Sequence, residues 1–132
     1  MLVKKKAVVV DDDLKIVMMV EKALTGIGFE VFQAENGIKA LELVKRERPD
    51  LLITDILIPG IDGIKLCKRV KEELDEDNIK VIIITGVFNE SNFRLEMDCN
   101  ADAFIAKPLD IKKLVQLVET TIIGNNRMNP IQ

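Results

Sequence analysis

Five short runs of consecutive apolar residues, rich in Val and Ile, recur along the chain and alternate with longer amphipathic stretches. A strand has such an uninterrupted apolar run when both of its faces are buried. The pattern therefore predicts an α/β fold of (βα)5 type, with helices on both faces of a parallel sheet. The expected strands are Ala7–Val10, Glu30–Ala34, Leu51–Thr54, Lys80–Thr85 and Ala103–Ala106.

The stretches between and after these runs place apolar residues at helical spacing. Asp62 and Asp110 are expected to cap helix starts, and Asn100 to end a helix in a left-handed conformation. The expected helices are Leu14–Leu24, Ile38–Arg46, Ile64–Leu74, Asn89–Cys99 and Ile111–Ile123. The apolar faces of the first two are expected to hold Leu14, Val17, Met18 and Leu24, and Ile38, Leu41 and Val44.

Length and composition narrow the class of protein. The 132 residues suit one domain, expected over residues 1–123, followed by a tail or linker remnant over 124–132. No apolar run approaches the roughly 20 residues of a membrane helix, and no signal peptide fits the start. Cys67 and Cys99 have neither metal-ligand nor disulfide spacing, so we expect ordinary thiols in a cytoplasmic protein. The net charge of −3 argues against direct nucleic-acid binding.

The residues that the chain lacks also exclude several chemistries. It contains no His, so Ser-His-Asp hydrolysis, histidine phosphotransfer from its own side chains and His-ligated metal sites are excluded. It has no glycine-rich nucleotide-binding motif. Any chemistry must therefore use carboxylates, Lys, Thr or Cys.

Such groups occur where the expected strands end. Asp11 and Asp12 follow the first strand, Asp55 the third, Thr85 ends the fourth, and Lys107 follows the fifth. Ligands of parallel sheets bind beyond these carboxyl ends. Three carboxylates so close would repel one another without a cation, and oxygen ligands suit Mg²⁺. Each residue alone could be a turn or a helix cap, but four successive strand ends in this order favour one site.

The motifs VVVDDD (Val8–Asp13), LLITDILIPGIDG (Leu51–Gly63), VIIITG (Val81–Gly86) and ADAFIAKPLD (Ala101–Asp110) resemble those of the response-regulator receiver family. The resemblance covers roughly residues 4–123. It implies a doubly wound, flavodoxin-like sheet with strand order 2-1-3-4-5.

The resemblance also implies roles for single positions. Asp55 matches the phosphorylated aspartate, and Lys107 the lysine beside it, with a cis peptide bond to Pro108. The implied contacts to Mg²⁺ (or Mn²⁺) are Asp11, Asp12, Asp55 and the backbone carbonyl of Leu57, with Asp12 the more direct ligand of the acidic pair. Thr85 and Phe104 match the switch hydroxyl and the switch aromatic ring.

The implied function is a phosphorylation-activated switch of a two-component system or phosphorelay, and not a turnover enzyme. A sensor histidine kinase or phosphotransfer protein would donate to Asp55. The surface of the fourth helix, fifth strand and fifth helix would then select an output partner, or act on an output domain outside this sequence. No membrane or direct nucleic-acid partner is implied, and homodimerisation on phosphorylation is an option that no residue requires.

Two other interpretations remain open. The chain could be a receiver-like interaction module that works without phosphorylation, or a small phosphohydrolase with an aspartyl nucleophile. The second needs another acid or base two residues after the nucleophile, where this chain has Leu57. Better-known receivers often carry polar groups at the positions of Leu57 and Val87, which handle the attacking water. Because both are apolar here, we predict that dephosphorylation without a partner is not fast.

Overall fold

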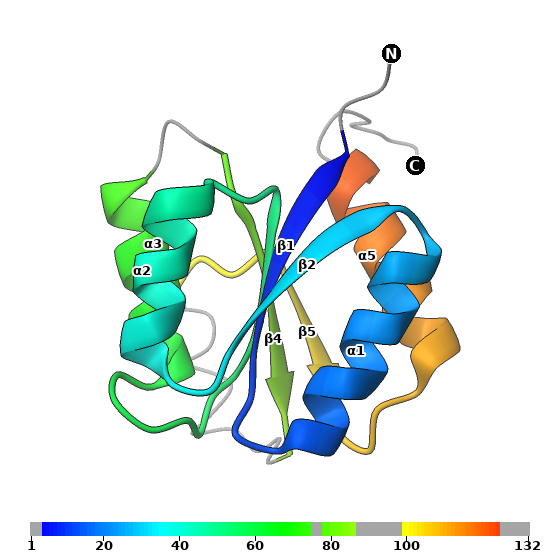
Figure 1. Cartoon of the computed structure of the whole chain (residues 1–132), viewed down its shortest axis with the longest axis horizontal. Helices are drawn as coiled ribbons and strands as arrows, with labels where there is room; N and C mark the ends of the chain where they lie inside the picture. Colours follow the sequence, from blue (N-terminus) through cyan, green and yellow to red (C-terminus); the bar gives the residue numbers. More distant parts are fainter. Residues whose placement is uncertain (1–3, 75–77, 87–98, 125–132) are drawn as a thin grey trace.

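The computed structural model describes residues 4–74, 78–86 and 99–124 of the chain. It has one sheet of five parallel strands, flanked by helices on both faces (Figure 1). The strands are β1 (Lys5–Val10), β2 (Phe29–Ala34), β3 (Leu51–Asp55), β4 (Lys80–Thr85) and β5 (Ala103–Ala106). The helices are α1 (Leu14–Gly26), α2 (Gly37–Glu47), α3 (Gly63–Glu73) and α5 (Ile111–Gly124). The helix expected over Asn89–Cys99 falls outside the described residues, apart from Cys99 itself.

The strand order is β2-β1-β3-β4-β5, which confirms the expected doubly wound topology. From β1 the chain moves first to one side, to β2, and then crosses to the other side, to β3. In sheets of this kind, the point where the strand order reverses leaves a crevice at the carboxyl ends of the two central strands. Here those strands are β1 and β3, which pair directly.

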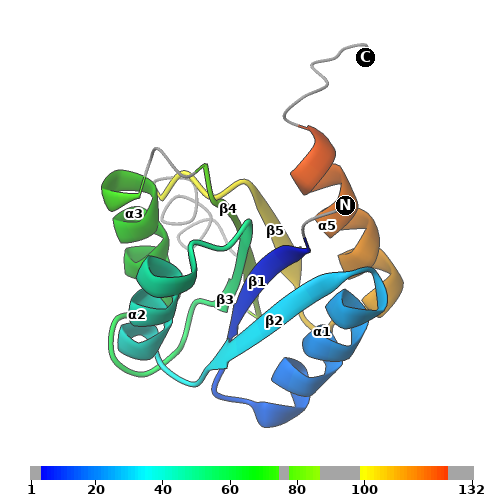
Figure 2. The same ribbon diagram turned by 45° about the horizontal axis from the view of Figure 1, so that its top comes forward.

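The helices α2 and α3 lie on one face of the sheet and α1 and α5 on the other (Figure 2), with a layer of apolar side chains on each face. Val8 and Val10 of β1 pack in the layer that contains α2 and α3, while Ala7 and Val9 pack in the layer that contains α1 and α5. All four side chains are fully buried. Because successive strand residues point to opposite faces, a strand covered on both sides must be apolar throughout, as the sequence pattern predicted.

Short capped connections link the strand ends to the following helices. Side-chain oxygens at the helix starts accept hydrogen bonds from backbone N–H groups that lack a partner within the helix. The caps are Asp13 to Lys15 (2.9 Å), Asn36 to Lys39 (2.8 Å), Asp62 to Lys65 (2.9 Å) and Asp110 to Lys112 (2.9 Å). The connections that follow β1, β2, β3 and β5 are therefore each fixed to the next helix by a capping hydrogen bond.

The structure corrects three core assignments and moves several element boundaries by one or two residues, such as the start of β1 and the end of β3. Leu14, Met18 and Ile38 are exposed by 64%, 58% and 55%, so the expected helix faces were wrong at these positions. Leu14 and Ile38 lie in first helical turns, and Met18 points away from the buried stripe of α1. Asp55 is the last residue of β3, not the first residue after it, and pairs in register with Ile84.

Cys67 and Cys99 are both buried thiols. Cys67 Sγ donates to the carbonyl oxygen of Cys99 at 3.2 Å. Contact with Cys99 and burial raise the pKa of the Cys67 thiol far above its ordinary value, so this thiol is not a nucleophile. Within the described ranges, no helix combines the length and apolar character needed to cross a membrane.

Candidate functional site

Three carboxylates meet where β1 and β3 end. Asp11 and Asp12 directly follow β1, and Asp55 ends β3. The two strands are in register, with Val10 opposite Thr54, so their ends lie level. One oxygen from each carboxylate lies within 4.8 Å of the others. Asp11 and Asp55 are buried, whereas Asp12 is exposed to solvent.

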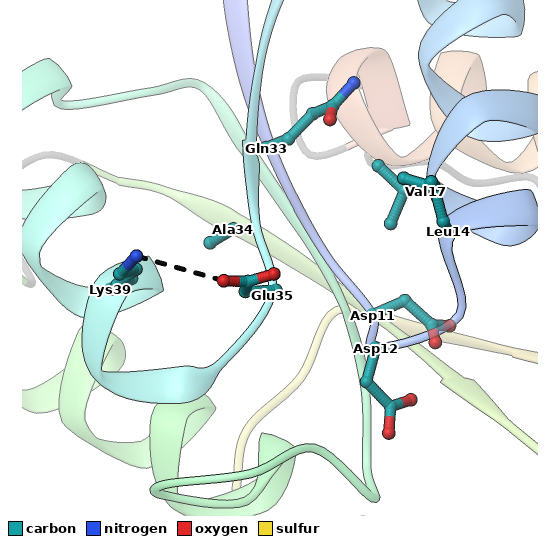
Figure 3. Close-up of a pocket in the computed structure, with 8 residues that line it drawn as sticks. All are labelled: Asp11, Asp12, Leu14, Val17, Gln33, Ala34, Glu35 and Lys39. Carbon is teal, nitrogen blue, oxygen red and sulfur yellow. Dashed lines mark ion pairs between the residues drawn. The ribbon is translucent and has the colours of Figure 1, made fainter.

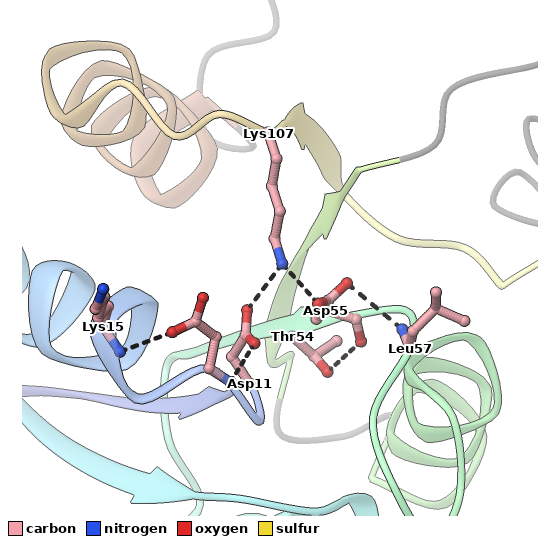
Figure 4. Close-up of polar contacts among 7 residues, drawn as sticks. Asp11, Lys15, Thr54, Asp55, Leu57 and Lys107 are labelled. Atoms are coloured by element: carbon pink, nitrogen blue, oxygen red, sulfur yellow. Dashed lines mark hydrogen bonds and ion pairs between the residues drawn. The ribbon is translucent and has the colours of Figure 1, made fainter.

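Lys107 reaches the same point from the end of β5 (Figure 4). Its Nζ donates to Asp55 Oδ2 at 2.8 Å and lies 3.4 Å from Asp11 Oδ2. Burial disfavours the ammonium charge, but the hydrogen bond to Asp55 and the two negative charges outweigh it, so the pKa of Lys107 lies above its ordinary value. Lys107 therefore stays charged and is shared by two carboxylates.

The two carboxylate oxygens of Asp11 differ in their hydrogen bonding. Its Oδ1 accepts the backbone N–H of Asp13 at 2.9 Å. Its Oδ2 is buried and accepts no hydrogen bond from the described residues, since Lys107 stands at ion-pair distance only. Burial raises the pKa of the Asp11 carboxyl above its ordinary value; the Asp13 hydrogen bond opposes this effect, and the nearby charge of Asp55 adds to it.

A divalent cation fits this arrangement. Three carboxylates face one ammonium group, and a buried oxygen of Asp11 lacks a hydrogen-bond donor. Oxygen ligands without His or Cys suit a hard ion such as Mg²⁺ or Mn²⁺. The residues that could hold such an ion are Asp11, Asp12, Asp55 and the carbonyl of Leu57.

The remaining predicted residues lie around this pocket. Thr85 is buried at the end of β4, and its carbonyl accepts the N–H of Lys107 at 2.8 Å. Phe104 is partly buried in β5, opposite Ile83, and packs on the layer of α2 and α3. The Lys107–Pro108 peptide bond is cis. Val87 falls outside the described residues.

Leu57 lies just past Asp55, with its side chain 71% exposed. Its N–H approaches Asp55 Oδ1 at 3.4 Å, a long hydrogen bond. No side chain with a titratable or hydroxyl group therefore occupies this position, and a second acid or base for phosphohydrolase chemistry is not supplied here.

Two residues that the sequence analysis did not assign to the site hold the backbone of Asp55. Thr54 Oγ1 donates to the carbonyl oxygen of Asp55 at 2.9 Å. The first residue of α3, Gly63, lies so close that a Cβ there would overlap the same carbonyl. Asp62 is the helix cap that the sequence predicts, but no side-chain pattern indicates the close approach of Gly63 to the Asp55 carbonyl.

A cavity of about 280 Å³ adjoins the acidic pair on the side of β2 (Figure 3). It is lined by Asp11 and Asp12, the start of α1 and the end of β2, and by Glu35, which pairs with Lys39 at 3.9 Å. The exposed carboxylate of Asp12 is thus open to solvent through this hollow. The cavity therefore borders the acidic pair, whereas Asp55 is not among the residues that line it.

Comparisons with known proteins identify the family of the chain. The family described as the response regulator receiver domain matches residues 7–119. The chain is similar to sporulation initiation phosphotransferase F of Bacillus subtilis, with 36% identity over 118 residues, covering 89% of this chain and 94% of the relative.

Solved structures show the same fold. The receiver domain of a signal transduction histidine kinase from Syntrophus aciditrophicus has a TM-score of 0.84 at 29% identity, covering 97% of each chain. A CheY-like receiver domain protein from Methanospirillum hungatei has a TM-score of 0.87 at 24% identity, covering 96% of this chain and 100% of that one, and supports the fold alone. The chain belongs to the response regulator receiver domain family, the signalling domains of two-component systems.

Proposed function

We propose that this receiver domain is switched by phosphorylation of Asp55. The observation that carries the proposal is Lys107 Nζ, shared between Asp55 at 2.8 Å and Asp11 at 3.4 Å beside a third carboxylate. A lysine used only for stability would need one carboxylate. Lys107 instead lies beside more negative charge than it can neutralise. This arrangement suits a site that binds a cation and a phosphoryl group together.

The chemical step is a phosphoryl transfer. A carboxylate oxygen of Asp55 attacks the phosphorus of a donor phosphohistidine, the new O–P bond forms, and the P–N bond to the donor imidazole breaks. The imidazole leaves with the electron pair and takes a proton from water. Lys107 is already positioned to neutralise a phosphoryl oxygen. A bound Mg²⁺ or Mn²⁺ would add positive charge at the same oxygens.

Phosphorylation would be sensed at the ends of β4 and β5. The Thr85 hydroxyl is proposed to donate to a phosphoryl oxygen, and the ring of Phe104 to move with it. The two strand ends are already joined, because the Thr85 carbonyl accepts the N–H of Lys107 at 2.8 Å. A shift at Thr85 would therefore move the start of the loop toward α5 and bias the adjoining surface toward one partner.

The proposed phosphoryl donor is a sensor histidine kinase or a phosphotransfer protein. The chain itself contains no His to act as an internal donor. Its relative in Bacillus subtilis is named a phosphotransferase, and one structural neighbour is the receiver domain of a histidine kinase. The output partner is left unspecified by these residues.

Incubation with acetyl phosphate and Mg²⁺ tests the assignment, with intact-protein mass spectrometry as the readout. The wild type should gain one phosphoryl group, and Asp55→Asn should gain none. Asp62→Asn is the matched control, because Asn caps a helix about as well as Asp and this residue lies in the same loop. Labelling of Asp55→Asn at the wild-type rate would refute the proposal.

A receiver-like module that works without phosphorylation would behave differently in one further measurement. Beryllofluoride mimics a phosphoryl group on a carboxylate only where a cation and a lysine hold it. Mg²⁺-dependent binding of beryllofluoride to the wild type, lost in Asp55→Asn, supports phosphorylation. Absence of binding in the wild type favours the alternative module.

A further inference from the structure

The loop between β3 and α3, residues 56–62, carries a proposed cation contact but is weakly fixed at that residue. The Leu57 side chain is 71% exposed and its N–H makes only a 3.4 Å hydrogen bond to Asp55 Oδ1. Neither group can hold the Leu57 carbonyl in one place. The position of this peptide must therefore depend on anchors on either side of it.

One anchor lies within the loop itself. The carbonyl of Ile56 accepts the N–H of Ile58 at 3.2 Å and the N–H of Gly63 at 2.9 Å. Ile58 is buried in the layer of α2 and α3. These contacts turn the chain tightly after Asp55, but they leave residues 59–61 to be held by another element.

That element is the start of α2. The N–H of Gly37, the first residue of the helix, donates to the carbonyl of Pro59 at 2.9 Å. N–H groups in the first turn have no partner within the helix, so the loop satisfies one of them. Asn36 caps the helix at 2.8 Å to the N–H of Lys39 and fixes the direction of the Gly37 N–H.

The two segments approach backbone to backbone. A Cβ on Gly37 would overlap the carbonyl oxygen of Ile61 and lie 2.6 Å from its Cγ1. Gly60, at φ +86°, would bring a Cβ to 3.4 Å from Ile38 Cγ1. A side chain at position 37 can be accommodated only if the loop or the first turn of α2 moves.

We propose that Gly37 is a positioning residue for divalent-cation binding at Asp11, Asp12 and Asp55. It acts through the 56–62 loop, which it holds by one hydrogen bond and by the absence of a side chain. The inference rests on the proposed function, because only there does the Leu57 carbonyl contact the cation. It adds a dependence on an element, α2, whose side chains are not among the proposed ligands.

The test is the affinity of the purified chain for Mn²⁺, measured from the electron paramagnetic resonance signal of free Mn²⁺. Gly37→Ala should weaken binding about ten- to a hundredfold, the usual effect of removing an outer support of a metal site. The control is Gly26→Ala, because a Cβ there has nothing within 4 Å. Its affinity should equal that of the wild type.

A second readout separates positioning from unfolding. Amide ¹H–¹⁵N spectra without metal should show Gly37→Ala folded, with displaced signals for Leu57, Ile58, Gly60 and Ile61 and unchanged signals in β4. If Gly37→Ala does not fold, Asn36→Ala decides the question, since loss of the cap that directs the Gly37 N–H should weaken Mn²⁺ binding severalfold. Wild-type affinity in a folded Gly37→Ala, or in Asn36→Ala where Gly37→Ala fails to fold, overturns the inference.

Failure of the proposed function gives a distinct result. If the wild type does not bind Mn²⁺, or binds it equally well after Asp12→Asn, the cation site itself is misassigned. If the wild type binds and Asp12→Asn does not, the site stands, and only the Gly37 variants then decide the role of α2.

Discussion

Two lysine–aspartate pairs lie at opposite ends of the sheet and differ in how completely they are satisfied. Lys71 of α3 pairs with Asp102, just before β5, at 2.6 Å. Lys107, just after β5, pairs with Asp55 at 2.8 Å and with Asp11 at 3.4 Å. The residue types and distances are similar, but the surroundings are not.

The pair at the amino end is closed. Lys71 Nζ also donates to the carbonyl of Ile79 at 2.9 Å, and Asp102 Oδ2 also accepts the N–H of Val81 at 2.8 Å. Each charge is balanced by one partner and by backbone groups. The pair at the carboxyl end is open, because three carboxylates cluster there and Lys107 pairs with two of them. A closed pair stabilises the fold. In the open cluster the carboxylates repel one another, so binding of a cation can stabilise the site.

The largest expected difference between the two ends of the sheet is the effect of Mg²⁺ on the free energy of unfolding. At a concentration about 100 times its dissociation constant, it should raise the free energy of unfolding of the wild type by about 2.7 kcal/mol, because it binds only the folded site. Urea unfolding followed by far-UV circular dichroism, with Mg²⁺ or with EDTA, measures the difference. Asp12→Asn should lose this gain and Asp102→Asn should keep it. An equal gain in Asp12→Asn would place the cation elsewhere.

The contribution of the closed end to stability should depend on the hydrogen bond from the Val81 N–H to Asp102. Asp102→Ala leaves the Val81 N–H and the Lys71 ammonium without their shared acceptor. We expect the free energy of unfolding to fall by about 1 kcal/mol, the net contribution of a typical hydrogen bond, because Asp102 is exposed to solvent. Asp102→Asn retains an oxygen acceptor and should lose less. Urea unfolding in EDTA measures both, and equal losses would show that the charge, not the backbone contact, carries the stability.

Substitution of a carboxylate at the open end should change the free energy of unfolding in the opposite direction. The pKa of Asp11 is raised in the folded protein, so the folded chain holds this proton more tightly than the unfolded chain does. Stability is therefore lost as the pH rises from the unfolded pKa of Asp11 through its higher folded pKa, and the full cost is present once the folded carboxyl is ionised. Asp11→Asn should remove it and raise the free energy of unfolding by about 1 kcal/mol, a typical single-substitution effect.

Urea unfolding at pH 7 in EDTA measures this change. The matched substitution is Asp102→Asn, which should destabilise the protein under the same conditions. Destabilisation by Asp11→Asn would mean that its ion pair with Lys107 outweighs burial and repulsion, and that the open end is also structural.

The sequence allowed the fold and one of these two ends to be predicted. Strands buried on both faces must be apolar throughout, and such a run can be recognised in the sequence alone, as in Val81–Ile84. The open cluster was predictable because its members follow strand ends, which a parallel sheet brings to one edge. Asp11, Asp55 and Lys107 do meet there.

The closed end had no such signal. Lys71 lies on the surface of α3 and Asp102 in a connection 31 residues later, and only their packing joins them. The same limit explains the errors at Met18 and Ile38, because helical spacing defines an apolar stripe but not where the sheet beneath it ends. The contact of Gly37 with the 56–62 loop is likewise a backbone approach that no side-chain pattern records.

The smallest effect concerns water at the open end. Leu57 presents an exposed apolar side chain directly after Asp55, where a polar group could orient an attacking water. Leu57→Asn should shorten the life of the acyl phosphate by a few-fold, equivalent to about 1 kcal/mol or less in the barrier. Loss of the phosphoryl group is followed by mass spectrometry after the donor is removed. Ile123→Asn, an equally large change at an exposed position of α5, should leave the lifetime unchanged. If Leu57→Asn also leaves it unchanged, water reaches the phosphoryl group by a route that Leu57 does not control, and the apolar residue at this position does not set the lifetime of the switch.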